Sequence, residues 1–191
     1  MEADQLTQLR NELSVKAKNG IDFTLAAAII WFAIYFIWNL DFSAYNRSIL
    51  VFCIGAPLLP LVFLFSKIMN TEWKIPTNPL QPLGLWFNFA QLFYFPFLIL
   101  VLIKFPDYFL VTYAIITGAH LFPYSWFYNN RIYAVFAAII PLSSLLLTFV
   151  LTQIQHSYIA LFTSCSLLVL TIILYVDFKS KKQKYSAKFV K

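Results

Sequence analysis

The sequence has little charge, and almost none of it lies in the long interior of the chain. Charged residues make up 12% of its 191 residues and hydrophobic residues 61%, whereas soluble domains average about 25% charged and 45–50% apolar residues. The apolar runs are too long for ordinary core helices, which excludes a soluble domain and predicts a helical membrane protein. No carboxylate falls in the middle of a predicted span, which argues against a proton-coupled transporter that uses buried Asp or Glu.

The sequence also lacks the motifs that identify most enzymes: HExxH, the Walker loop, GxSxG and CxxC are all absent. His120 is the one histidine inside a span, and a single histidine cannot bind a metal alone, so we expect no metal and no cofactor. Cys53 and Cys165 are predicted to be small buried side chains, and they could pair only if their helices touch. His156, in an outer turn, is expected to be solvated.

What the sequence does contain is a series of six apolar segments. They predict an all-α polytopic membrane protein, a six-helix transmembrane domain over 21–178. The first run lacks a small-residue cleavage site and is expected to remain as an anchor. Residues 1–20 are predicted to form a cytoplasmic amphipathic surface helix, and 179–191 a basic cytoplasmic tail. The predicted spans lie near 21–40, 48–69, 83–104, 106–128, 132–151 and 158–178.

The basic residues predict the orientation of these spans. Six spans place both termini on one side, and with that side inside, twelve of the fourteen Lys and Arg residues lie in inner segments. Only Arg47 and Lys104 lie in outer loops, which is a strong positive-inside signal for cytoplasmic termini in the cell membrane. The net charge of +6 therefore indicates membrane lipids as partners rather than nucleic acid. Each of the six tail lysines should attract anionic headgroups by about 1 kcal/mol.

Prolines are expected to interrupt several of the spans. Pro57 and Pro60 predict a bent or broken second helix, and Pro96 and Pro123 predict bends in the third and fourth. Such irregular backbone is tolerated only against protein or a water-filled cavity, so the second helix should face the bundle interior with its bend. The proline-rich connection 70–82 is predicted to be an extended surface linker, with a docking strand for a partner as the alternative.

A set of uncharged polar residues marks the candidate site on the third and fourth spans. The steps of 4, 3 and 4 from Tyr113 to Tyr124 place four polar residues on one helix face. The tight outer turn at 104–107 makes the two helices antiparallel neighbours. Gln91 and His120 each lie about eight residues, or roughly 12 Å, from the inner surface. We therefore predict that they share one layer, in direct or water-bridged reach. The candidate pocket comprises Asn88, Gln91, Tyr94, Tyr113, Thr117, His120 and Tyr124.

Neutral donors and acceptors among aromatic residues suit a small amphipathic or lipid-like ligand. Aromatic residues, 19% of the chain, would also suit capture of a hydrophobic cation. Three alternatives remain open. His120 could be a neutral interhelical hydrogen-bonding residue that fixes packing, or the acid or base of an intramembrane enzyme. The protein could also be structural or regulatory, acting through its inner loop and tail.

The run NELSVKAKNGIDF (Asn11–Phe23), the apolar spans and the later run GAHLFPYSWFY together carry a resemblance. The chain resembles a family of small bacterial membrane proteins of unknown function. This resemblance covers most of the chain and implies a location in the bacterial cytoplasmic membrane. It implies nothing about chemistry.

Overall fold

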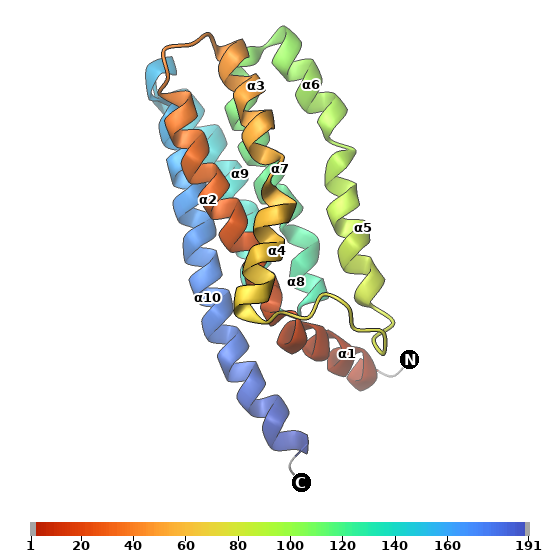
Figure 1. The fold of residues 1–191 in the computed structure, drawn as a ribbon. Coiled ribbons are helices and arrows are strands. Elements are labelled where there is room, and N and C mark those ends of the chain that lie inside the picture. The colour runs from red at the N-terminus through yellow and green to blue at the C-terminus, as the bar shows by residue number, and fades with distance from the viewer. Residues whose placement is uncertain (1–2, 190–191) are drawn as a thin grey trace.

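The computed structural model describes residues 3–189, with side chains over 4–184, so the predicted roles of Lys188 and Lys191 lie outside the described side chains. The described residues form an elongated bundle of helices without strands (Figure 1). Its α-helices are α1 (Ala3–Lys16), α2 (Ile21–Trp38), α3 (Ala44–Gly55), α4 (Leu58–Met69), α5 (Gln81–Leu92), α6 (Phe95–Lys104), α7 (Phe109–His120), α8 (Phe122–Phe127), α9 (Ile132–Val150) and α10 (Ser157–Phe189). Short 3-10 turns cover Lys18–Gly20, Pro106–Tyr108 and Gln153–His156.

Five helical segments are long and apolar enough to cross a membrane, as expected for a multi-pass membrane protein. They are Lys18–Trp38, Ala44–Met69, Gln81–Lys104, Ile132–Val150 and Gln153–Lys184. The predicted fourth span is not among them, and the chain there divides at Leu121 into α7 and α8. Pro123 lies in the first turn of α8. It has no N–H to donate to the preceding turn, so the continuous helix ends there.

The centre of the bundle is the long contact between α2 and α10. Ala28 is buried on the face of α2 that also carries Thr24, and its small side chain lets the two helices approach closely. Hydroxyl groups join the helices as well. Thr171 donates to the Thr24 hydroxyl at 2.8 Å, and Ser164 donates to the carbonyl of Ala28 at 2.8 Å. Small residues and interhelical hydrogen bonds are the forces that hold helices together in lipid.

Helix α7 packs equally closely against α9. A Cβ placed on Gly118 would lie 2.5 Å from Cδ of Pro141 and 2.8 Å from Cβ of Ile140. These distances are below van der Waals contact, so only glycine fits without moving one of the helices. Pro141 stays inside a continuous helix, and its ring is the surface against which α7 rests.

The predicted interruptions of the second and third spans are present. The second span divides between α3 and α4 at Ala56–Pro57, and the third between α5 and α6 at Phe93–Tyr94. Helices α5 and α6 form a column along one side of the bundle (Figure 1). Leu98 of α6 is fully buried, whereas none of the twelve described residues of α5 is buried. The column is therefore anchored mainly through α6.

Two predictions about single residues need revision. Cys53 and Cys165 are exposed free thiols, not buried side chains, because they lie on outward faces of α3 and α10. His156 is buried rather than solvated, with 6% of its surface exposed, because the outer 3-10 turn is packed against the bundle. The segment after residue 178 continues α10 as helix, which projects beyond the inner end of the bundle (Figure 1).

The N-terminal helix α1 lies across the inner end of the bundle and contacts α8 and α10 (Figure 1). Of its predicted apolar stripe, Leu13 is fully buried and Leu6, Leu9 and Ala17 are half-buried. Ser14 is also fully buried, which the stripe did not predict. Helix α1 is thus part of the packed inner end.

Candidate binding cavity

A cavity of about 360 Å³ lies between α2, α4, α5, α7 and α8. The loop over residues 70–80 lines its inner end. Most of its wall is apolar, contributed by side chains such as Trp31, Leu58 and Leu167. Six of the seven predicted site residues also line it: Asn88, Gln91, Tyr113, Thr117, His120 and Tyr124.

Tyr94 is the exception. It lies outside the cavity lining and is 53% exposed. The prediction extended the i, i+3 spacing of Asn88 and Gln91 by one more step, but α5 ends at Leu92. The break at Phe93–Tyr94 ends that helical register, so Tyr94 no longer shares a face with Gln91.

His120 of α7 and Gln91 of α5 both line this cavity, and their position in one layer stays a prediction. The His120 ring meets the Tyr124 ring edge-on at 5.4 Å, and its Nε2 lies 3.4 Å from the tyrosine hydroxyl. That distance marks a weak hydrogen bond. Among the described side chains no hydrogen bond joins His120 directly to Gln91. The amide of Asn88 donates to the carbonyl of Gly84 at 2.9 Å within its own helix.

Aromatic rings form two stacked groups along the cavity. Trp31 stacks on Tyr113 with centroids 5.1 Å apart. Tyr124 stacks on Tyr128 at 6.1 Å, and Tyr128 stacks on Tyr133 at 5.9 Å. All five rings line the cavity. Tyr128 has a ring stacked on each face, so the π faces left for an occupant are those of the outer rings and of the Trp31–Tyr113 pair.

Asp22 is the main lining residue that the sequence did not assign to the site. Its side chain is buried, with 1% of its surface exposed, and it lies in the first turn of α2. The hydroxyl of Thr71 and the indole N–H of Trp73 each donate to Oδ2 at 2.8 Å. The amide N–H of Phe23 donates to Oδ1 at 3.0 Å. From the sequence, Asp22 is simply an acidic residue at a helix start near the membrane boundary.

The proline-rich loop is attached to the protein itself. Ile75 is buried, and the amide of Asn78 donates to the carbonyl of Leu9 and to the Glu12 carboxylate, both at 2.9 Å. The N–H of Glu72 donates to the carbonyl of Lys16 at 3.1 Å. The loop is therefore fixed to α1, and through Asp22 to α2. It encloses one end of the cavity, which corrects its description as a plain surface linker.

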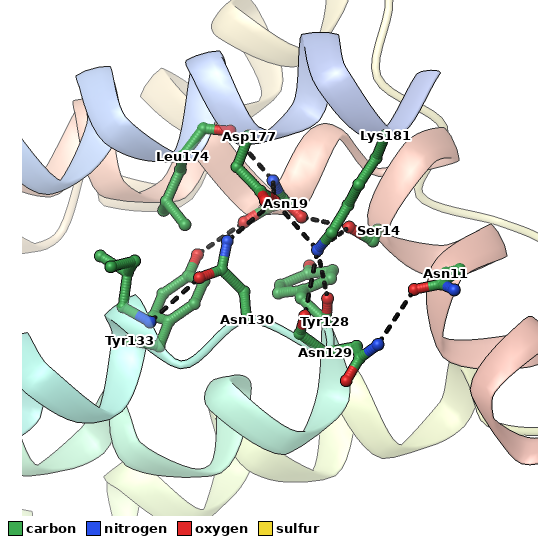
Figure 2. A network of polar contacts seen from close by, with 11 residues as sticks. Asn11, Ser14, Asn19, Tyr128, Asn129, Asn130, Tyr133, Leu174, Asp177 and Lys181 are labelled. Carbon is green, nitrogen blue, oxygen red and sulfur yellow. Dashed lines mark hydrogen bonds and ion pairs between the residues drawn. The ribbon is translucent and has the colours of Figure 1, made fainter. Parts of the chain in front are cut away.

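Below the cavity, a polar network joins the inner ends of four segments (Figure 2). Asn19 is fully buried with φ of 56°, and its amide donates to the carbonyl of Leu174 and to the Asp177 carboxylate, both at 2.9 Å. The hydroxyl of Tyr133 donates to the Asn19 carbonyl at 2.6 Å. Lys181 forms an ion pair with Asp177 at 2.9 Å. Further hydrogen bonds of the network come from Ser14 to Asn19, from Asn130 to Asp177, and from Lys181 to Ser14, Tyr128 and Asn129.

Within the described part of the chain, no group of three or more His, Cys, Asp or Glu side chains could hold a metal ion. The polar partner of His120 is a tyrosine, and no described serine or cysteine lies within hydrogen-bond distance of its ring. The lining offers apolar surface, π faces, neutral amides and hydroxyls, and one buried carboxylate.

Comparison with known proteins places the chain in a family. No curated protein and no solved structure matches it. A family model matches residues 6–177, which include the packed part of α1, the whole cavity and α10 as far as Asp177. The predicted resemblance to a family of unknown function is thereby confirmed. The chain belongs to the family described as "Family of unknown function (DUF7010)".

Proposed function

We propose that this protein binds a small amphipathic or lipid-like molecule in the cavity between α2, α5, α7 and α8. The observation that supports this function is the cavity itself, about 360 Å³ in volume and lined by both apolar and neutral polar side chains. Ligand sites are typically concave, mostly apolar and about 300–1,000 Å³, with a few polar groups that orient the ligand. Both the size and the lining fit this description.

Helix α5 is the wall through which we expect such a molecule to enter. None of its twelve described residues is buried, and the chain is interrupted directly after it, at Phe93–Tyr94. The interruption between α3 and α4 lies across the cavity, where Gly55 and Leu58 line it. A helix with few buried contacts is held weakly and can move without breaking a core. An amphipathic molecule could then exchange sideways with the lipid.

The proposal includes six membrane crossings with both termini in the cytoplasm. Helices α7 and α8 together supply the sixth crossing, over 109–127, between the outer turn at 105–108 and the inner turn at 128–131. Asn46 would then face outside and Asn129 inside. Cysteines introduced singly at these two positions, in a chain without Cys53 and Cys165, would be labelled by a membrane-impermeant reagent from opposite sides. Labelling of both from the same side would contradict the six-crossing arrangement.

Gly55→Leu tests the cavity directly. A Cβ on Gly55 meets only the Tyr113 hydroxyl, at 3.6 Å, so a leucine there extends into the open space. Binding is measured with the neutral fluorescent probe N-phenyl-1-naphthylamine, titrated against protein in lipid nanodiscs. We expect the affinity to fall by about tenfold, which corresponds to about 1.4 kcal/mol. The thermal unfolding midpoint should not change.

Ala90→Leu is the matched control, because Ala90 is exposed on α5 and does not line the cavity. Ala90→Leu also introduces a leucine, but on the side of α5 that faces lipid, so binding of the probe should be unchanged. Equal saturable binding to the wild type and to Gly55→Leu, or no saturable binding to the wild type, would contradict the proposed function.

The other functions have less support. An enzyme that uses His120 as acid or base needs a reacting group within reach of the ring, and the hydroxyl near it belongs to Tyr124 at 3.4 Å. A regulatory role for the inner loop needs the loop to be available to a partner. The loop is instead fastened to α1 and α2 by Asn78, Thr71 and Trp73.

A further inference from the structure

The charges that line the cavity do not balance. Its lining contains three charged side chains, Asp22, Glu72 and Lys74. Glu72 and Lys74 are exposed on the loop, where water can solvate both, whereas Asp22 is buried. Among the described side chains no lysine or arginine pairs with Asp22, since the ion pairs present are Glu12–Lys16 and Asp177–Lys181. The buried part of the cavity therefore carries an uncompensated negative charge.

Neutral hydrogen bonds hold the Asp22 carboxylate in place without cancelling its charge. Thr71 and Trp73 both donate to Oδ2, while Oδ1 accepts one bond, from the N–H of Phe23. An ionised carboxylate has about four acceptor positions, so Oδ1 can accept from one more donor. The start of α2 also favours an anion, but by a partial charge only. Buried charges in proteins are normally paired, which leaves a place for a cation.

The aromatic rings offer the second element of a cation site. Tyr128 lies close to the start of α2, because a Cβ on Gly20 would be 3.1 Å from its hydroxyl. Tyr128 is the middle ring of the Tyr124–Tyr128–Tyr133 stack, so its faces are covered by its neighbours and are not open to a cation. Trp73, which holds the carboxylate, also lines the cavity. The faces of tyrosine and tryptophan rings attract cations by their quadrupole, more strongly where water is excluded.

We infer that the ligand of this cavity is a hydrophobic cation, with Asp22 as its counter-ion. This inference rests on the proposed function and names the ligand class of the same site. The cationic centre lies at the inner end, between the free position on Oδ1 of Asp22 and the ring of Trp73. The apolar body of the ligand extends toward Trp31 and Gly55, where the lining is uncharged.

The test compares tetraphenylphosphonium, a rigid hydrophobic cation, with triphenylphosphine oxide, a neutral molecule of related shape. Binding of each is measured by equilibrium dialysis to the full chain in nanodiscs of zwitterionic lipid, which avoids accumulation of the cation at anionic headgroups. The wild type should bind the cation at least about tenfold more tightly, a difference of about 1.4 kcal/mol. Asp22→Asn should abolish this preference and leave binding of the neutral probe unchanged.

Asn at position 22 can still accept hydrogen bonds from Thr71 and Trp73, so the loop should remain attached. Asp41→Asn, at an exposed outer position, is the matched control and should preserve the preference. Equal affinity of the wild type for the two probes would overturn the cation inference and leave the cavity as a neutral site. Failure of both probes to bind would instead overturn the proposed function. If Asp22→Asn does not fold, the wild-type preference alone decides between these outcomes.

Discussion

Helix α2 buries nine of its eighteen residues, whereas α5, also apolar and facing the same cavity, buries none of the twelve that the structure describes. The difference does not come from hydrophobicity, because α2 and α5 each belong to a segment that is apolar enough to cross a membrane, Lys18–Trp38 and Gln81–Lys104. Helix α2 has small residues and hydroxyl partners along α10, including Ala28 with Ser164. Helix α5 presents large side chains such as Trp86 and Phe89, which are exposed.

The comparison shows what holds a helix in place when its surroundings are lipid. Apolar surface gains little from leaving lipid for protein, so close packing and interhelical hydrogen bonds must hold the helix. The α2, α7, α9 and α10 side has both kinds of contact, and the α5 side has few. The cavity lies where these contacts end. A binding protein needs this combination of a rigid scaffold and a wall that can move.

Gly118→Ala should have the largest effect on stability. The added Cβ would meet the ring of Pro141 at 2.5 Å and Cβ of Ile140 at 2.8 Å. Neither neighbour is the end of a flexible side chain, so α7 and α9 must separate. We expect a destabilisation of about 1–3 kcal/mol, as for other overpacked cores. Thermal unfolding in detergent measures it.

Gly55→Ala is the control for Gly118→Ala, since its Cβ meets only the Tyr113 hydroxyl, at 3.6 Å. It should unfold at the same temperature as the wild type. If Gly118→Ala also left the unfolding temperature unchanged, the α7–α9 contact would not be the rigid part of the scaffold.

Asn19→Ala should have an effect of comparable size, because Asn19 joins α10 to the start of α2 through its side chain. The substitution removes its amide bonds to Leu174 and Asp177 and leaves buried polar groups unsatisfied, at a cost of about 1–3 kcal/mol. The backbone at Asn19 has φ of 56°, which Asn tolerates better than Ala. Asn19→Gly loses the same hydrogen bonds without that strain, so it should be slightly more stable than Asn19→Ala.

Chemical unfolding followed by tryptophan fluorescence gives both values, with exposed Asn46→Ala as the unaffected control. If Asn19→Ala lowered the free energy of unfolding no more than Asn46→Ala does, the polar network would not stabilise the packing of α2 against α10.

The helical fold, the interrupted spans and six of the polar residues that line the cavity could be predicted from the sequence, because each depends on local spacing. Steps of three and four placed Tyr113, Thr117 and His120 on one face, and prolines marked the interruptions. The prediction that Tyr94 shares a face with Gln91 was wrong, because α5 ends two residues before Tyr94. The spacing of polar residues does not show where a helix ends. The positions of the prolines likewise could not show whether the two helices on either side of an interruption together remain long enough to count as one span.

The contribution of Asp22 could not be predicted, because it depends on contacts across about fifty residues of sequence. Thr71 and Trp73 lie in a loop whose composition indicates only extended chain. The same limit applies to Asn19, whose partners are Leu174 and Asp177. Exposure of Cys53 and Cys165 was misjudged for a different reason. Cysteine is usually buried in soluble proteins, but a lipid-facing position is also apolar.

Gly84→Ala should have the smallest effect, although Gly84 also lies at a helix contact. A Cβ there would be 3.0 Å from Cζ of Phe127, the far end of a ring, and α5 has no described buried residue to hold it in place. The helix can therefore shift outward, and alanine favours helix over glycine by about 0.8–1.0 kcal/mol. We expect a net change in unfolding free energy within about 0.5 kcal/mol of zero.

The two glycine-to-alanine variants, Gly84→Ala and Gly118→Ala, measured together by thermal unfolding, thus compare the two sides of the bundle with one chemical change. A destabilisation of Gly84→Ala as large as that of Gly118→Ala would show that α5 is fixed as firmly as α7. The route of entry past α5 would then have to be abandoned.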